Sequence, residues 1–356
     1  MKGFPSIRID GDEAAHRQIT TQLRELILSG ALKLGTRLPG LRELAEQIGT
    51  NYFTVQAALT PLVGEGLIER RPRHGTVVIR NSLQFTSVGI YFGAEISQDG
   101  SSFYPGLYDC LFKKLQAQGI EARLFIDSRR LEQQGETCPH IQKAIQNHEI
   151  QGVIGGMLLP EHNQWLNELP VPVSLMTTAH YANSVKSDNR QMVRAALRQL
   201  AARGCKTVEM LPHRCFHGVE YGRICDEEAL EAGVQLLDGM ERTAWDFYPT
   251  KADYGYQVFK NRWHAGKHPD GLMVYPDPFI PGVITAILEA GIQVPRELKL
   301  IFSGNRELPM HCPLPVDWLM ASISDMADAM IGHLQLQLRG EKPEETWIPS
   351  SVVKGY

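Results

Sequence analysis

Side chains that could contact DNA bases are grouped in a short stretch near the N-terminus. Asn51 precedes a helical pattern in which Tyr52, Phe53 and Gln56 hold early positions. Gln can pair with adenine in the major groove, and an aromatic ring can meet the methyl group of thymine. Asn51 is expected to cap this helix by accepting a hydrogen bond from the amide of residue 53 or 54. An alternative is that Phe53 and Val55 are core residues and only Gln56 faces DNA.

Basic side chains crowd a turn that follows this helix. Arg70, Arg71, Arg73 and His74 come directly before or within the turn, which ends at Gly75. Cationic side chains are attracted to the concentrated negative potential of a narrow minor groove. We therefore expect this turn to contact DNA, the alternative being a solvated turn that only aids solubility.

Three helical patterns and two strand-like runs would position these residues. Apolar residues from Ile19 to Ile27 recur at helical spacing, and Ser29–Pro39 stops and restarts the chain. Two more helices are joined through Ile48–Asn51, and Gly66–Ile79 has strand character broken by the basic turn. This order predicts a winged helix-turn-helix, which lays one helix in a major groove. Arg42 and Thr54 would then hold phosphates, which fix position without reading sequence.

This segment closely resembles the GntR family of bacterial transcription regulators. The resemblance implies binding to double-stranded operator DNA. Departures from the family pattern are Gly40 in place of a capping Ser, Tyr52 and Gln56 in place of common Arg residues, and Arg73 in place of a wing Gly. Gly40 predicts a weaker start of its helix. The family's usual base contacts are not carried over to the other departing positions, and the fold pattern is unaffected. The matching residues are Arg17-Gln18-Ile19, Leu38-Pro39, Arg42, Leu44-Ala45, Asn51 to Leu59, Leu62, Glu65 to Ile68, and Gly75-Thr76.

Length and charge indicate a basic head on a larger acidic body. The 356 residues are long for one domain, so two or three compact units are expected. Residues 1–80 carry 11 Lys and Arg against 8 Asp and Glu, a net +3, whereas the remainder carries 25 against 32, a net −7. This asymmetry suits a phosphate-binding module attached to a body that avoids DNA.

Hydropathy predicts neither a membrane span nor a secretory signal. No stretch approaches the roughly 18–20 apolar residues that a span requires, and residues 1–11 contain no apolar signal core. We therefore expect a cytoplasmic protein whose six cysteines are reduced thiols.

The body alternates near-continuous apolar strands with amphipathic helices, a pattern typical of parallel sheets covered on both faces. About 270 residues suffice for two such sheets. The expected strands include 88–92, 122–126, 152–157, 173–176, 207–211, 271–275 and 298–302, and the expected helices include 107–115, 192–200 and 280–290.

This alternation resembles the effector domain of the LacI/GalR regulators, which is built like a periplasmic sugar-binding protein. The resemblance implies an α/β fold with two subdomains, a sugar-like effector and a homodimer. We expect a winged helix-turn-helix at 1–80, a linker at 81–86 and the ligand-binding and dimerisation domain at 87–356. The matching residues are Phe103-Tyr104, Asp188-Asn189, Ala201 to Gly204, Asp277, Ile301 to Asn305 and Leu338-Arg339-Gly340.

Five residues of the body are candidates for effector contact. Asp277 follows a strand between two prolines, where a carboxylate could accept two sugar hydroxyls, as the resemblance implies. The alternative is that Asp277 caps a turn. Phe103, Asp188 and Asn305 are candidates on the same grounds, and Arg223 stands near the position of a family Arg although its neighbours are out of register.

Metal binding and catalysis have little support in the sequence. His213 to His217, with Cys205 nearby, form the one metal-like cluster, but they lack the paired spacing of a zinc site. The cluster could instead contribute to the ligand cleft or form an ordinary loop. Nucleophile and phosphate-binding motifs are missing, so we expect no cofactor and no enzymatic activity.

These observations together predict an effector-controlled DNA-binding regulator, and the family resemblance alone implies that it is a repressor. Two alternatives stay open. The body could serve only for dimerisation and bind no effector, or it could be an enzyme regulated by the head.

Overall fold

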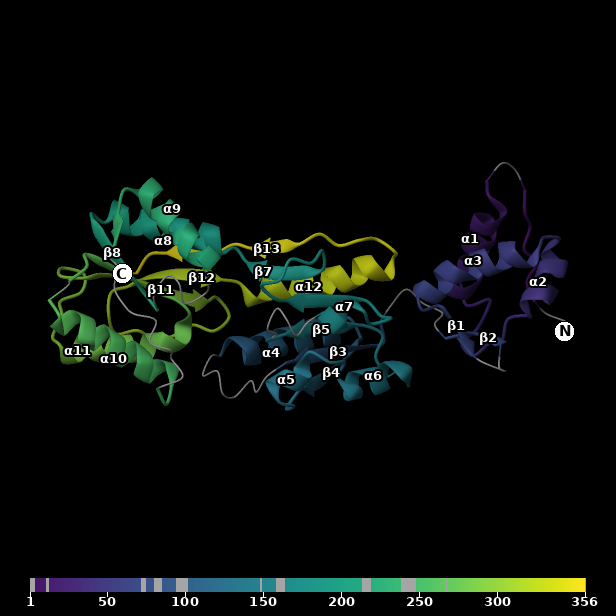
Figure 1. Ribbon diagram of the computed structural model, residues 1–356, viewed down its shortest axis with the longest axis horizontal. Coiled ribbons are helices and arrows are strands. Elements are labelled where there is room, and N and C mark those ends of the chain that lie inside the picture. Colours follow the sequence, from purple (N-terminus) through teal and green to yellow (C-terminus); the bar gives the residue numbers. More distant parts are fainter. Residues whose placement is uncertain are drawn as a thin grey trace.

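Three bodies follow one another along the chain in the computed structural model: a small N-terminal head, a first α/β unit beside it and a second α/β unit at the far end (Figure 1). The structure describes residues 4–10, 13–71, 75–79, 85–93, 102–147, 149–157, 164–212, 219–237, 248–266 and 268–355.

The head is a winged helix-turn-helix, as the sequence predicts. Its wing strands pair antiparallel from Ile68 opposite Val78 to Arg71 opposite Gly75. The apolar faces of the three helices meet in one core that includes Leu23, Leu44 and Leu59. Its elements are α1 (Ala15–Leu28), α2 (Leu41–Ile48), α3 (Tyr52–Gly64), β1 (Ile68–Arg71) and β2 (Gly75–Val78).

Local signals in the sequence set the turn between α2 and α3. Gly49 follows α2 with φ of +77°, a left-handed conformation that costs glycine little. Asn51 then caps α3, because its Oδ1 accepts a hydrogen bond from the amide of Thr54 at 2.9 Å. Gly40 offers no side-chain cap to α2, as expected from the sequence.

The first α/β unit is a six-stranded parallel sheet in the order β13-β7-β6-β5-β3-β4. Apolar clusters cover both of its faces. The strands are β3 (Ser87–Phe92), β4 (Glu121–Ile126), β5 (Val153–Gly156), β6 (Val173–Met176), β7 (Ser184–Ser187) and β13 (Thr346–Ile348). The helices are α4 (Phe103–Ala117), α5 (Leu131–Gln134), α6 (Pro139–Gln146), α7 (Gln164–Asn167) and α12 (Ile323–Leu338).

The second α/β unit is a six-stranded sheet in the order β14-β12-β11-β10-β8-β9. The expected parallel pairing holds except at its edge, where β14 pairs antiparallel with β12. The strands are β8 (Thr207–Leu211), β9 (Gln235–Leu236), β10 (Gly271–Val274), β11 (Lys299–Asn305), β12 (Asp317–Ala321) and β14 (Ser351–Val353). The helices are α8 (Asn189–Ala202), α9 (Val219–Ala232), α10 (Lys251–His264), the short 3-10 helix η3 (Asp277–Phe279) and α11 (Ile280–Glu289).

The chain passes between the two units three times: after β7, after β12, and between β13 and β14. Asp188 stands at the first crossing and caps α8, and Ser322 stands at the second and caps α12. Gln191 joins the first crossing to the third, since its Nε2 donates to the backbone oxygen of Ser350 at 2.8 Å and its Oε1 accepts from the amide of Ser350 at 3.0 Å. Two of the three connections are thereby fastened to each other.

A search of the described helices for a segment with the length and apolarity of a membrane span finds none.

Candidate functional site

The solvent-facing side of α3 carries the residues expected to contact bases. Val55 is fully buried with the head core, whereas Phe53 is 77% exposed and Tyr52 is 39% exposed. Gln56 lies on the same outward side and is half-buried. The interpretation in which Phe53 is a core residue is therefore wrong, and α3 presents two aromatic rings and an amide to solvent.

The wing and α2 place further polar groups around α3. Arg70 donates to the backbone oxygen of Gln56 at 3.3 Å, which joins the wing to the helix. Arg42 is exposed in the first turn of α2, while the exposed Arg71 forms an ion pair of 2.7 Å with Glu69. Gly75 begins β2 with φ of +79°. Arg73 and His74 lie outside the described residues.

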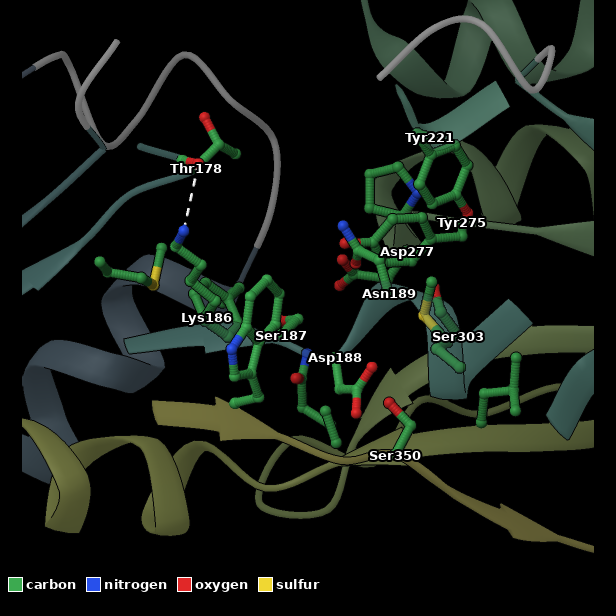
Figure 2. Close-up of a pocket in the computed structure, with 18 of the residues that line it drawn as sticks. Thr178, Lys186, Ser187, Asp188, Asn189, Tyr221, Tyr275, Asp277, Ser303 and Ser350 are labelled. Carbon is green, nitrogen blue, oxygen red and sulfur yellow. Dashed lines mark hydrogen bonds between the residues drawn. The ribbon is translucent and has the colours of Figure 1, made fainter. Parts of the chain in front are cut away.

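A cleft of about 970 Å³ lies at the crossings between the two α/β units. Its walls come from both units, with Phe103 and Tyr104 of α4 on one side and the residues after β10 on the other. Four of the five expected contact residues line it: Phe103, Asp188, Asp277 and Asn305. Figure 2 shows Asp188 beside Ser350, and Asp277 near Asn189.

Arg223 does not line the cleft, so its expected role as a contact residue is not supported. It lies on an outward side of α9, where its guanidinium pairs with Glu220 and Glu227, both at 2.6 Å. The reason is helical geometry, because Tyr221, two positions earlier on the same helix, faces the cleft instead.

Asp277 sits among ionisable groups with shifted pKa values. Burial raises the pKa of Tyr275 to about 12, and the nearby Asp277 carboxylate adds to the shift. Burial lowers the pKa of Lys251, whereas Asp277 opposes that shift. The N-caps of η3 and α11 are Pro276 and Phe279, so Asp277 caps neither helix. Asp277 therefore lies in the cleft wall, close enough to Lys251 and Tyr275 to influence the pKa of each.

Tyrosines from both units line the cleft, Tyr104 from the first and Tyr275 from the second. Burial raises the pKa of Tyr104 to about 12, and Tyr275 of the opposite unit contributes to the shift. Tyr275 also stacks on Tyr221, with ring centroids 6.3 Å apart and planes at 24°. These phenols stay protonated at neutral pH and can donate hydrogen bonds, and their rings offer flat apolar surfaces to a ligand.

Lys186 forms a charged cluster in the wall of the first unit. Its side chain is 6% exposed, and Nζ lies 2.5 Å from Glu345 Oε1 and 5.0 Å above the ring of Trp347. Burial raises the pKa of Glu345, but hydrogen bonds from Lys186 and His180 outweigh this effect and lower it overall. Figure 2 shows Lys186 directed toward the backbone of Thr178, to which it donates at 3.3 Å.

Two buried polar atoms in the cleft wall have no hydrogen-bond partner among the described residues. They are Ser303 Oγ near the end of β11 and Asn189 Oδ1 at the start of α8. Buried polar groups in native proteins are almost always satisfied, so a partner for either atom would have to come from outside the described residues. Sequence analysis did not select either residue as a site, although Asn189 follows Asp188 directly and Ser303 lies two positions before Asn305.

The metal-like cluster of the sequence cannot be placed, because residues 213–218 lie outside the described part of the chain. Cys205, its fourth candidate member, is buried in the core of the second unit. The described residues contain no group of three or more His, Cys, Asp or Glu side chains arranged to hold a metal ion.

Two family models match the chain. Residues 15–78 match the model of bacterial regulatory proteins of the gntR family. Residues 184–355 match the model of the periplasmic-binding-protein-like domain. The first match covers α1 to β2 of the head, and the second covers the second unit together with β7, α12 and β13 of the first unit.

Known relatives share the architecture of the body. Catabolite control protein A of Staphylococcus aureus is 25% identical over 225 residues, which are 58% of this chain and 64% of that protein. A sugar-binding LacI-family regulator from Enterococcus faecalis superposes with a TM-score of 0.57 at 18% identity, covering 76% of this chain and 97% of the other. The regulator CelR in complex with cellobiose gives a TM-score of 0.61 at 16% identity, covering 89% and 99%. The chain thus spans less than two thirds of the length of this catabolite control protein, and the structural similarity establishes the fold.

Proposed function

We propose that this chain, which joins a GntR-family helix-turn-helix domain to a periplasmic-binding-protein-like domain of the kind found in LacI-family regulators, is a sequence-specific transcription repressor. Its head binds double-stranded operator DNA, and its body binds a small sugar-like effector that controls operator affinity. The proposal includes a homodimer and the domain limits 1–80, 81–86 and 87–356. It locates the protein in the cytoplasm, with its operator, and assigns it no enzymatic activity.

One observation carries the proposal: the cleft takes its walls from both α/β units, between which the chain crosses three times. A ligand held between Tyr104 of one unit and Asp277 of the other would favour the arrangement in which both walls contact it. A ligand shifts such an equilibrium only by its difference in affinity for the two arrangements. A cleft lined from both sides provides that difference.

The polar groups of the cleft suit a polyhydroxylated ligand. Carboxylate oxygens of Asp188 and Asp277 can accept hydrogen bonds from hydroxyls, and the phenols of Tyr104 and Tyr275 can donate them. Aromatic rings such as Phe103 provide apolar surface, so the cleft combines a mostly apolar lining with a few convergent polar groups. Asn305 completes the set of proposed contacts.

In a dimer, closure of the cleft would affect DNA binding through the spacing of the two heads. The first unit begins with β3 directly after the linker region, so it bears the head, whereas the second unit lies at the far end of the molecule (Figure 1). Closure of the cleft in a dimer would alter the separation of the two heads relative to two operator half-sites. Within each head, Tyr52, Phe53 and Gln56 would face bases, with Arg42, Asn51, Thr54, Arg71, Arg73, His74 and Gly75 at the backbone or the minor groove.

The experiment is a thermal-shift screen of mono- and oligosaccharides on the full chain, followed by operator titrations with and without each stabilising sugar. Operators would first be selected from random duplex DNA. We expect at least one sugar to raise the melting temperature and to change operator affinity, since a ligand that binds only the folded protein stabilises it.

Three outcomes would contradict the proposal in different ways. A chain that selects no DNA sequence refutes a regulatory role. A chain that selects an operator but gains no stability from any sugar supports a body that only dimerises. Turnover of a stabilising sugar after incubation would instead identify an enzyme.

A further inference from the structure

Two exposed aromatic rings stand at the start of α3. Phe53 is 77% exposed, more than any other aromatic side chain in the described part of the chain. Tyr52 packs edge-on against it, with ring centroids 5.5 Å apart and planes at 90°. The pair therefore forms a small, ordered apolar projection.

The head core does not explain this projection. The buried residues of α3 are Val55, Ala58, Leu59 and Leu62, all on the opposite side of the helix. Phe53 loses favourable apolar burial by facing water, at about 25 cal/mol per Å² of exposed apolar surface. The two rings are therefore available to a partner on this side of α3.

The surroundings of the pair match a major groove. The first turn of the second helix of a helix-turn-helix contacts base edges. Phe53 lies in that first turn, followed on the same side by Gln56 and Thr60, and Arg42 is exposed on the neighbouring α2. The occupant must therefore combine an apolar group with hydrogen-bonding edges and with phosphates nearby.

We infer that Phe53 contacts the 5-methyl group of a thymine in each operator half-site. Thymine is the base that presents a methyl group in the major groove, whereas guanine is typically contacted by Arg or Lys. Phe53 has no hydrogen-bonding group in its side chain, and Gln56 on the same side of α3 suits adenine. This inference rests on the proposed function and specifies it: the head distinguishes A·T from G·C by a methyl contact.

Tyr52 acts as a positioning residue for that contact. Its ring packs edge-on at a right angle against the Phe53 ring, and this contact favours the observed orientation of Phe53. Tyr52→Phe should retain the support, whereas Tyr52→Ala should weaken the preference for the methyl group while Phe53 is still present.

The test uses operators selected by the full chain from random duplex DNA, with each thymine replaced in turn by deoxyuridine. Deoxyuridine keeps the pairing with adenine and removes only the methyl group. We expect one thymine per half-site at which the replacement weakens binding about 4-fold, and about 15-fold when both half-sites are changed, because one methyl-sized group contributes about 0.8 kcal/mol.

Phe53→Ala provides the decisive comparison. It should bind the unmodified operator as weakly as the wild type binds the deoxyuridine operator, and it should no longer distinguish the two. Leu230→Ala is the matched control, because Leu230 is 84% exposed on α9 of the second unit and should leave methyl discrimination unchanged. Phe53→Leu should retain part of the discrimination.

Three outcomes would overturn the inference. The first is that no thymine responds to deoxyuridine although an operator is selected. The second is that discrimination persists in Phe53→Ala. The third is that Phe53→Ala changes the oligomeric state by sedimentation without changing methyl discrimination, which would make the pair an interface between copies. Failure to select any operator refutes the proposed function itself and is distinct from these results.

Discussion

Replacing Ser303 by alanine should strengthen the unliganded fold and weaken the ligand complex. Ser303 is 6% exposed, and its Oγ has no partner among the described residues. An unsatisfied buried hydroxyl costs about 1–3 kcal/mol, and the wall of an open cleft belongs at the low end of that range. We therefore expect Ser303→Ala to raise the free energy of unfolding by about 1 kcal/mol in the absence of ligand.

The same substitution should cost ligand affinity. A neutral hydrogen bond contributes about 0.5–1.5 kcal/mol, which corresponds to a roughly 2- to 12-fold loss of affinity. Denaturant unfolding measures the first effect, and calorimetric titration with the sugar identified by thermal shift measures the second. A change of opposite sign in the two measurements is what distinguishes a ligand contact from a packing residue.

Ser322 supplies a matched control at the neighbouring crossing. It is 4% exposed, but its Oγ donates to Glu307 and accepts from the amide of Asp325, both at 3.0 Å. Ser322→Ala should therefore lower stability by about 0.5–2 kcal/mol, as loss of a helix cap does. If Ser303→Ala destabilised the unliganded protein as Ser322→Ala does, the reasoning about its unsatisfied hydroxyl would be refuted.

Other predictions separate the remaining roles. Gln56→Ala should reduce the preference for the cognate base at one base pair by about 1–3 kcal/mol. Arg71→Ala should weaken binding to all DNA sequences alike and lower the slope of log affinity against log salt concentration by about one. Identical specificity profiles of the two variants would contradict both roles. Asp277→Ala should abolish the effect of the sugar on operator affinity while unliganded binding persists, and a normal response in the titration would remove Asp277 from the site. Burial lowers the pKa of His333, so the unfolded chain takes up a proton first and stability should fall as pH drops below about 6.5. His333→Gln should flatten that dependence in denaturant unfolding at pH 7.5 and 5.5, and an unchanged dependence would assign it to other groups.

The sequence predicts the head well because its signals are local. The helix spacing, the Asn51 cap and the Gly75 turn each lie within a few residues of the structure they determine. The exposure of Phe53 was not predictable on the same basis. The helical periodicity also allowed a core position for Phe53. Its exposure depends on which side of α3 is covered by α1 and the wing, and those tertiary contacts cannot be read from local sequence.

The cleft is less predictable because its residues meet only through topology. Asp277 and Asp188 follow strands, so the ends of parallel strands could identify them. Lys186 and Trp347 come from parts of the chain far apart in sequence and meet because β13 pairs with β7. Arg223 shows how sensitive such a prediction is to position on a helix. Tyr221 lines the cleft, whereas Arg223, two positions later on α9, forms an exposed ion pair.

The three crossings of the chain have a consequence for synthesis on the ribosome. The first unit needs α12 and Ile348 to complete its core, although its first strand lies directly after the head. At ~5–20 residues per second, those segments are made roughly 10–50 s after the head is complete. On the proposed function, each nascent chain would therefore carry a finished winged helix-turn-helix for that interval before its effector-binding body is complete.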